Sequence, residues 1–255
     1  MIRPLLVFTV IGLALNFGIV TLNPVRPRLE MFEAHREVVL SSLDCAHDAY
    51  YRASVFSGPS LHFHLQSLEA RKKNEFELFA ELVYAVLTAW GMHRMGPGGS
   101  KMREFDDFRD SLAKVWPLAQ DLQDVDPDNF NEEHLAGLEQ IFTGLRVMAS
   151  GTSLIGNSKV LAHLLPNIVP PVDRAYTLRF LYGHGRIENG IVDEWEKLRC
   201  ILVHFFYPVV LSSRFREKAA EWIERKDTFK WDTSPLKVAD NLVIGLSKIL
   251  VPERV

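Results

Sequence analysis

The sequence predicts an all-α protein, a compact multi-helix domain preceded by an apolar N-terminal helix. Apolar residues recur at helical spacing along most of the chain. No segment alternates apolar and polar residues as a half-buried strand would, and no internal repeat is visible. With 255 residues, 47% of them hydrophobic, the chain can bury one large core. We expect an apolar leader over residues 1–30 and one all-α globular domain over residues 31–255.

The leader contains a long uncharged run, residues 4–22. At about 1.5 Å per residue, a helix of this length just spans the hydrocarbon of a bilayer. Arg26 and Arg28 follow the run, so a membrane anchor would leave the body on the cytoplasmic side of the inner membrane. We prefer this interpretation. A cleaved signal peptide, or a gene start placed upstream of a true start at Met31, remains open.

The body is predicted to contain a series of amphipathic helices separated by polar or glycine-rich breaks. The helices are expected over residues 31–53, 74–90, 101–123, 131–150, 159–166, 191–211, 214–226 and 233–251.

Several of these helices carry recognisable start signals or breaks. Asn74 and Glu77 have the spacing of a capping box, in which two side chains satisfy the first free amides of a helix. Pro117 is expected to kink or split its helix. "GTSLIGNS", residues 151–158, is predicted to be a tight turn. Ser234 is predicted to cap the last helix, whose inward stripe is Leu236, Ala239, Leu242, Val243, Leu246, Ile249 and Leu250.

The charge of the chain is unevenly distributed, although its formal net value is only -3. Residues 104–133 carry ten acidic and two basic side chains, whereas residues 146–186 carry five basic side chains and one acidic one. The second region is therefore attractive to an anion, unless the two regions are simply two differently solvated faces. The two cysteines lie far apart in sequence, which indicates neither a disulfide framework nor a zinc site.

The most informative stretch runs from the predicted turn at residues 151–158 to the helix after Asp173. A glycine turn between helices points backbone amides outward, where they and Lys159 can hold a phosphate. Lys159 and His163 are four residues apart and share a helix face. Pro170 and Pro171 stiffen the approach to Asp173, which falls at the start of the next helix.

This stretch resembles the helix-hairpin-helix superfamily of DNA glycosylases, in which a hairpin L-P-G-V-G-x-K precedes an apolar helix and a P-V-D motif. Leu154 and Gly156 match the hairpin, and Pro171, Val172 and Asp173 match P-V-D. The chain departs from the pattern because a serine replaces the second glycine and the lysine comes one residue early. The match covers about forty residues, by a loose motif alignment.

The resemblance implies that Asp173 is the catalytic carboxylate and Lys159 the nucleophile of a glycosylase or lyase acting on duplex DNA. The residues expected to contact DNA are Gly156, Asn157, Ser158, Lys159, His163, Arg174 and Arg179. "WGMHRMG" and "GNSKVLAHLLP" also resemble stretches of uncharacterised bacterial proteins.

Other interpretations compete with this one. Asp173 can simply cap its helix, and a membrane-anchored, non-enzymatic module could use residues 4–22 and an unknown protein partner. A third possibility is a small-molecule enzyme that combines His93, Arg94 and Asp173. "GPGGSK" lacks the order of a phosphate loop, and His62 and His64 do not share a helix face, so no cofactor and no metal is expected.

Overall fold

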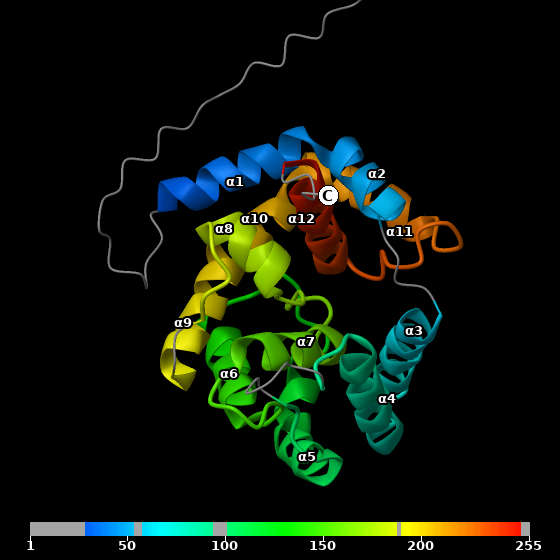
Figure 1. Cartoon of the computed structure of the whole chain (residues 1–255), viewed down its shortest axis with the longest axis vertical. Coiled ribbons are helices and arrows are strands. Elements are labelled where there is room, and N and C mark those ends of the chain that lie inside the picture. The colour runs from blue at the N-terminus through cyan, green and yellow to red at the C-terminus, as the bar shows by residue number, and fades with distance from the viewer. Residues whose placement is uncertain (1–28, 54–57, 94–100, 188–189, 251–255) are drawn as a thin grey trace, which may run out of the picture.

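The structure, a computed structural model, describes residues 29–53, 58–93, 101–187 and 190–250, and it confirms an all-α fold (Figure 1). Within these ranges no strand forms, and Met102 and Met148 make one isolated β-bridge. The predicted anchor, residues 4–22, lies outside the described residues.

The predicted helices appear in order, but α3 was not predicted and the expected helix over residues 31–53 is divided into α1 and α2. Two short π-helical turns, η1 and η2, lie among the helices. In chain order the elements are α1 (Leu29–Ser41), α2 (Leu43–Ala53), α3 (Pro59–Lys72), α4 (Phe76–Ala89), α5 (Phe105–Asp121), α6 (Glu132–Gly144), α7 (Leu154–Leu164), η1 (Arg174–Leu178), α8 (Arg179–Tyr182), α9 (Ile191–Ile201), η2 (Leu202–Phe206), α10 (Tyr207–Leu211), α11 (Ser213–Glu224) and α12 (Pro235–Leu250).

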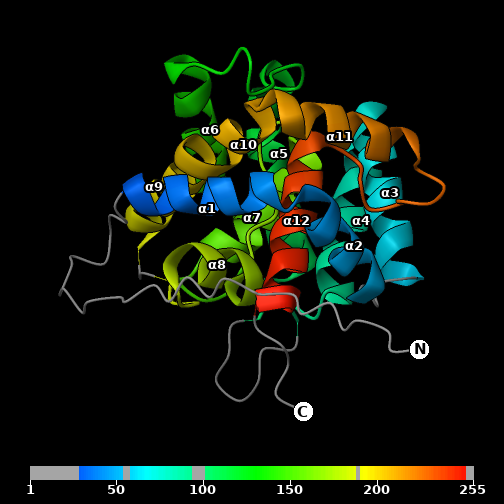
Figure 2. The ribbon, with the colours of Figure 1, turned by 90° about the horizontal axis from the view of Figure 1, so that it is seen from above.

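Helix α12 runs through the middle of the molecule, with α1 and α2 beside it (Figure 2). Its start agrees with the prediction, since the Ser234 hydroxyl oxygen accepts a hydrogen bond from the amide of Lys237 at 3.2 Å. Five of the seven predicted stripe residues are buried. The prediction that the last two are buried is wrong, since Ile249 is 43% exposed and Leu250 is 59% exposed. The final turn of α12 extends beyond the core.

The predicted capping role of Asn74 is wrong, because tertiary contacts hold its side chain elsewhere. Asn74 does not cap α4, which begins at Phe76. Its backbone φ is 59°, and its side-chain oxygen accepts hydrogen bonds from Trp116 at 3.1 Å and Gln120 at 2.8 Å. Of the two outcomes expected at Pro117, a split helix is wrong, since α5 continues through it to Asp121.

The predicted turn over residues 151–158 is also wrong, because α7 begins at Leu154. The carboxylate of the fully buried Glu194, on α9, accepts hydrogen bonds from the amides of Ser153 and Leu154. A negative charge at this end of a helix is favourable, because the first amides and the helix dipole are both satisfied. Glu194 therefore starts α7 from a distance of about forty residues in sequence.

None of the helices in the described ranges is by itself long and apolar enough to cross a bilayer. A bent pair, residues 191–211 and 213–224, passes that test by length and composition only.

Candidate functional site

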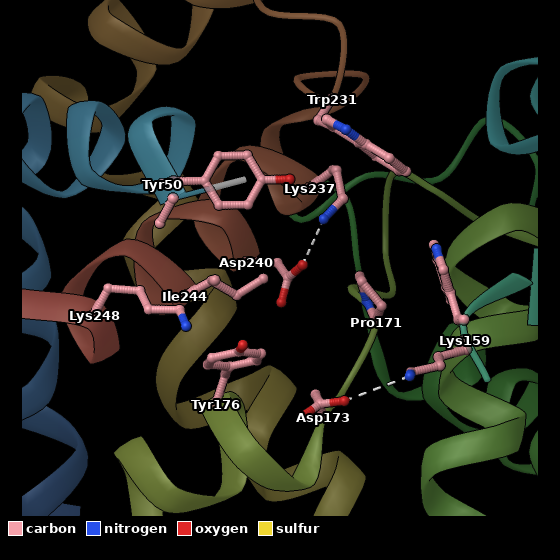
Figure 3. A pocket seen from close by; sticks show the side chains of 12 residues that line it. Tyr50, Lys159, Pro171, Asp173, Tyr176, Trp231, Lys237, Asp240, Ile244 and Lys248 are labelled. Carbon is pink, nitrogen blue, oxygen red and sulfur yellow. Dashed lines mark hydrogen bonds and ion pairs between the residues drawn. The ribbon is translucent and has the colours of Figure 1, made fainter. Parts of the chain in front are cut away.

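A cavity of about 250 Å³ opens between α2, α7, η1 and α12 (Figure 3). Its walls combine aromatic rings with charged side chains. The aromatic residues are Tyr50, Trp90, Tyr176 and Trp231. The charged residues are Lys159, Asp173, Lys237, Asp240 and Lys248.

The structure brings Lys159 and Asp173 together at one side of this cavity. The Lys159 ammonium lies 3.5 Å from Asp173 Oδ2 and 5.3 Å from the centre of the Trp90 ring. The side chain of Lys159 is 11% exposed and that of Asp173 34%, so the pair is shielded but reaches the opening. The two residues that the sequence singled out for chemistry are therefore neighbours in space.

Ser158 explains why these two side chains meet. Its hydroxyl oxygen accepts a hydrogen bond from the amide of Val172 at 3.2 Å, which ties the chain before η1 to α7. Because Lys159 follows Ser158 and Asp173 follows Val172, this contact places the next pair of residues side by side. Pro171, which also lines the cavity, restricts the backbone just before the contact.

The two carboxylate oxygens of Asp173 make different contacts. Oδ1 accepts a hydrogen bond from the amide of Ala175 at 2.6 Å, so the capping interpretation is confirmed. Oδ2 faces Lys159. Capping and a role in the cavity are therefore compatible in this residue.

The expectation that Gly156, Asn157 and Ser158 present outward amides is wrong, because all three are buried inside α7. The Asn157 side chain donates a hydrogen bond to the carbonyl of Phe142 at 2.8 Å. A β-carbon on Gly156 would lie 2.9 Å from the Met148 side chain, so this glycine allows α7 to approach the segment before it closely. These residues pack α7 against its neighbours.

The other predicted contact residues divide into buried and exposed ones. His163 is 1% exposed and faces the interior. Arg174 and Arg179 are exposed at η1 and at the start of α8. Lys159, Arg174 and Arg179 are thus the predicted residues whose side chains reach the surface or the cavity.

Sequence reasoning missed a second charged pair, Lys237 and Asp240 on α12. The Lys237 ammonium lies 2.7 Å from Asp240 Oδ2 and 2.7 Å from Asn241 Oδ1. Burial is the strongest single influence on the pKa of Lys237 and lowers it, but Asp240, Tyr50 and Asp232 together outweigh burial and raise that pKa. Burial raises the pKa of Asp240, and Lys237 opposes that shift. A charged residue at an inward position of an otherwise apolar helix was the sequence signal for this pair.

A buried hydrogen-bonded chain supports Lys237 from behind. The Asn241 amide nitrogen donates to Asp232 Oδ1 at 2.7 Å, and the imidazole of His47 contacts Asp232 Oδ2 at 2.7 Å. Because a carboxylate can only accept, His47 carries a proton on Nε2. His47 is itself stacked on Trp222 at 3.9 Å between ring centres. The orientation of Lys237 is therefore fixed by partners on α2 and before α12.

Two buried histidines lie behind Lys159. His163 Nδ1 donates to the Lys159 carbonyl at 2.7 Å, which leaves its Nε2 to accept from His64 Nδ1 at 2.9 Å. His64 Nε2 then accepts from the Thr233 hydroxyl at 3.2 Å. Burial lowers the pKa of His163 to about 4 and lowers that of His64 well below its usual value. Both imidazoles are therefore neutral at pH 7, and this arrangement positions α7 relative to α3.

Of the residues combined in the small-molecule hypothesis, Asp173 lines the cavity and His93 does not. His93 donates to the Thr88 carbonyl at 3.0 Å, and Arg94 lies outside the described residues. In the part of the chain that the structure describes, no group of three metal-ligating side chains is assembled. A wider groove of about 830 Å³ along α3 contains Arg71, whose guanidinium donates to the carbonyls of Leu164 and Ala119 and thereby joins three helices.

Comparisons with protein-family models, with curated proteins and with solved structures find no match for this chain.

Proposed function

We propose that the protein takes a nucleobase-sized planar ligand into this cavity and that Lys159 and Asp173 act on it, with a base extruded from DNA as the first source to test. The observation that carries the proposal is the 3.5 Å approach of Lys159 to Asp173 beside aromatic walls. Enzymes that act on a base within DNA hold it, outside the helix stack, between aromatic or apolar side chains.

The chemistry of the pair suits the glycosylase or lyase activity that the sequence resemblance implies. A lysine amine must lose its proton before it can form a bond to a sugar carbon. Asp173 Oδ2 is placed to accept that proton or to stabilise positive charge that develops on the sugar. The base would leave with the electrons of the broken bond.

The size of the cavity supports a small ligand. Pockets for drug-sized molecules usually measure about 300–1,000 Å³, and this cavity measures about 250 Å³. A single base therefore suits it better than a larger cofactor. Tyr50, Tyr176 and Trp231 offer ring surfaces on which a base could stack.

Contact with a DNA strand would rest on side chains, because the amides of Gly156, Asn157 and Ser158 lie inside α7. Arg174 directly follows Asp173, and both Arg174 and Arg179 are exposed. Positive side chains beside the cavity would neutralise phosphates, and such binding weakens as the salt concentration rises.

The test is DNA binding by the full chain across a salt series, followed by an assay for base release and for a covalent intermediate trapped by a hydride reductant. Lys159→Met keeps the apolar stem against Trp90, and Asp173→Asn keeps a side chain that can cap η1. Both variants should abolish base release, whereas Lys114→Ala, on the exposed face of α5, should not. If the wild type neither binds DNA at low salt nor binds free nucleosides, the proposal is wrong.

The alternative, a membrane-held module that recognises a protein partner, rests on the apolar run at residues 4–22. Fractionation of the native protein from its cells tests it, because an anchored chain would remain with the membranes after a high-salt wash.

A further inference from the structure

We propose that Asp240 and Lys237 recognise the ligand as a pair, one accepting a hydrogen bond from it and the other donating one to it. Such a pair selects a planar heterocycle in which an N–H group stands beside an acceptor atom. This inference rests on the proposed function, because it requires a ligand in the same cavity.

Asp240 provides the first half of the pair. Asp240 is 2% exposed, and its Oδ2 accepts a hydrogen bond from the Lys237 ammonium at 2.7 Å. Oδ1 has no hydrogen-bond partner among the described residues, although the side chain lines the cavity and points into it (Figure 3). Because Oδ1 is open to the cavity, its lone pairs are available to accept a hydrogen bond from a donor group of a ligand.

Lys237 provides the second half. An ammonium has three N–H groups, and two of them point to Asp240 Oδ2 and Asn241 Oδ1. The third has no oxygen or nitrogen acceptor in the part of the chain that the structure describes. Because Asn241 is held in turn by Asp232, the ammonium cannot turn away without breaking buried hydrogen bonds. The donor is therefore held ready for a ligand.

The surroundings of the pair favour a flat ligand. The Lys237 ammonium lies 5.9 Å from the centre of the Tyr50 ring and 5.7 Å from that of Trp231. In Figure 3 the Asp240 carboxylate lies between the rings of Tyr50 and Tyr176. A heterocycle that enters along these rings would present its edge to the pair.

The ligand class follows from the order of donor and acceptor. Asp240 Oδ1 accepts from an N–H, and Lys237 donates to a neighbouring carbonyl oxygen or ring nitrogen. This edge occurs in cyclic lactams and amidines, which include pyrimidine and purine bases. Asp173, Lys159, Asp240 and Lys237 all line the same cavity of about 250 Å³, so the recognising pair and the reacting pair are placed to contact one ligand at the same time.

The test compares a base with its N-methyl counterpart, which lacks the N–H. The probes are uridine and inosine, each with its ring N–H intact or methylated, offered both as free nucleosides and within a short single-stranded DNA. Calorimetry on the full wild-type chain should show that methylation weakens binding by about tenfold or more, the discrimination expected of a two-point contact. The two kinds of probe distinguish a free ligand from a base in DNA.

In Asp240→Asn, the side-chain oxygen can still accept the hydrogen bond from Lys237. The amide nitrogen then takes the place of Oδ1, so a donor replaces the acceptor that faces the cavity. This variant should lose most of the difference between parent and methylated probes, while Asp48→Asn, an exposed control on α2, should keep it. Equal wild-type affinity for parent and methylated probes would overturn the inference and leave the proposed function standing. Binding of none of the probes would overturn both. The wild-type comparison decides the matter even if Asp240→Asn fails to fold.

Discussion

Gly245 on α12 allows a very close approach to the backbone of α2, and replacing it should destabilise the protein strongly. A β-carbon at this position would lie 1.9 Å from the carbonyl oxygen of Ala46 on α2. It would also lie 3.0 Å from the amide nitrogen of Tyr50. The first distance is 1.5 Å short of the 3.4 Å at which ordinary contact begins. Because the contacting atom is backbone, no side chain can move to make room.

Gly245→Ala must therefore push α12 away from α2, and overpacking of this kind costs about 3 kcal/mol. For a chain of this size that corresponds to a fall in Tm of about 6–12 °C. The measurement is thermal unfolding followed by circular dichroism, with urea unfolding as a second determination. Because Tyr50 is on α2 and Asp240 on α12, the same variant should also weaken ligand binding in the cavity.

Gly137→Ala is the matched control. Gly137 lies inside α6, and a β-carbon there would make ordinary contact with Leu122 at 3.6 Å. Since alanine favours a helix over glycine, this variant should gain up to about 1 kcal/mol. An unchanged Tm for Gly245→Ala would refute the close approach of α12 to α2.

Three further predictions concern charge. Burial lowers the pKa of His163 to about 4 in the folded protein, whereas its value in the unfolded chain is about 6.5. The contribution of neutral His163 to the free energy of unfolding is therefore fully present above pH 6.5. It declines by roughly 3 kcal/mol as the pH falls toward 4. Urea unfolding at a series of pH values should show this slope. His163→Gln should lack the contribution of His163, while the buried His64, whose pKa is also lowered, should keep its own. Glu194→Gln should cost about 1–2 kcal/mol because α7 loses the charge at its first amides, whereas Glu196→Gln on the exposed side of α9 should cost little. Asp173→Ala should cost about 1 kcal/mol through the lost cap, while Asp173→Asn should keep most of the stability and still lose base release.

Hydrophobic periodicity was sufficient to predict the fold class and most of the helices, but not α3. The apolar positions of α4 and α12 recur at helical spacing, and most of them are buried. Local signals were less dependable where a distant residue intervened. Asn74 has the spacing of a capping residue, yet its side chain is held by Trp116 and Gln120 on α5. Residues 151–158 were predicted to be a turn, yet α7 begins at Leu154, where Glu194 supplies the negative charge that starts the helix.

Of the two charged pairs that line the cavity, the sequence predicted one, Lys159 and Asp173, and missed the other. Lys159 and Asp173 stood out because prolines and a glycine-containing stretch surround them, and the two residues are close in sequence. Lys237 and Asp240 come from α12, more than sixty residues further along the chain, and only the packing of α12 against α2 and η1 brings them to the same cavity. A charged residue among the inward positions of a helix is the pattern that would have identified them.

The two interpretations of Asp173 that the sequence left open do not exclude each other. The helix turn η1 needs an acceptor for its first amides, and one carboxylate oxygen provides it. That contact fixes the carboxylate, so the second oxygen is held toward Lys159 without cost to any other interaction. Asp240 repeats the arrangement on the opposite side of the cavity, since Lys237 engages one oxygen and the other faces the open space. In both residues a structural contact orients a carboxylate whose remaining oxygen is available to a ligand, which is how a rigid helical fold can present two acceptors at defined positions.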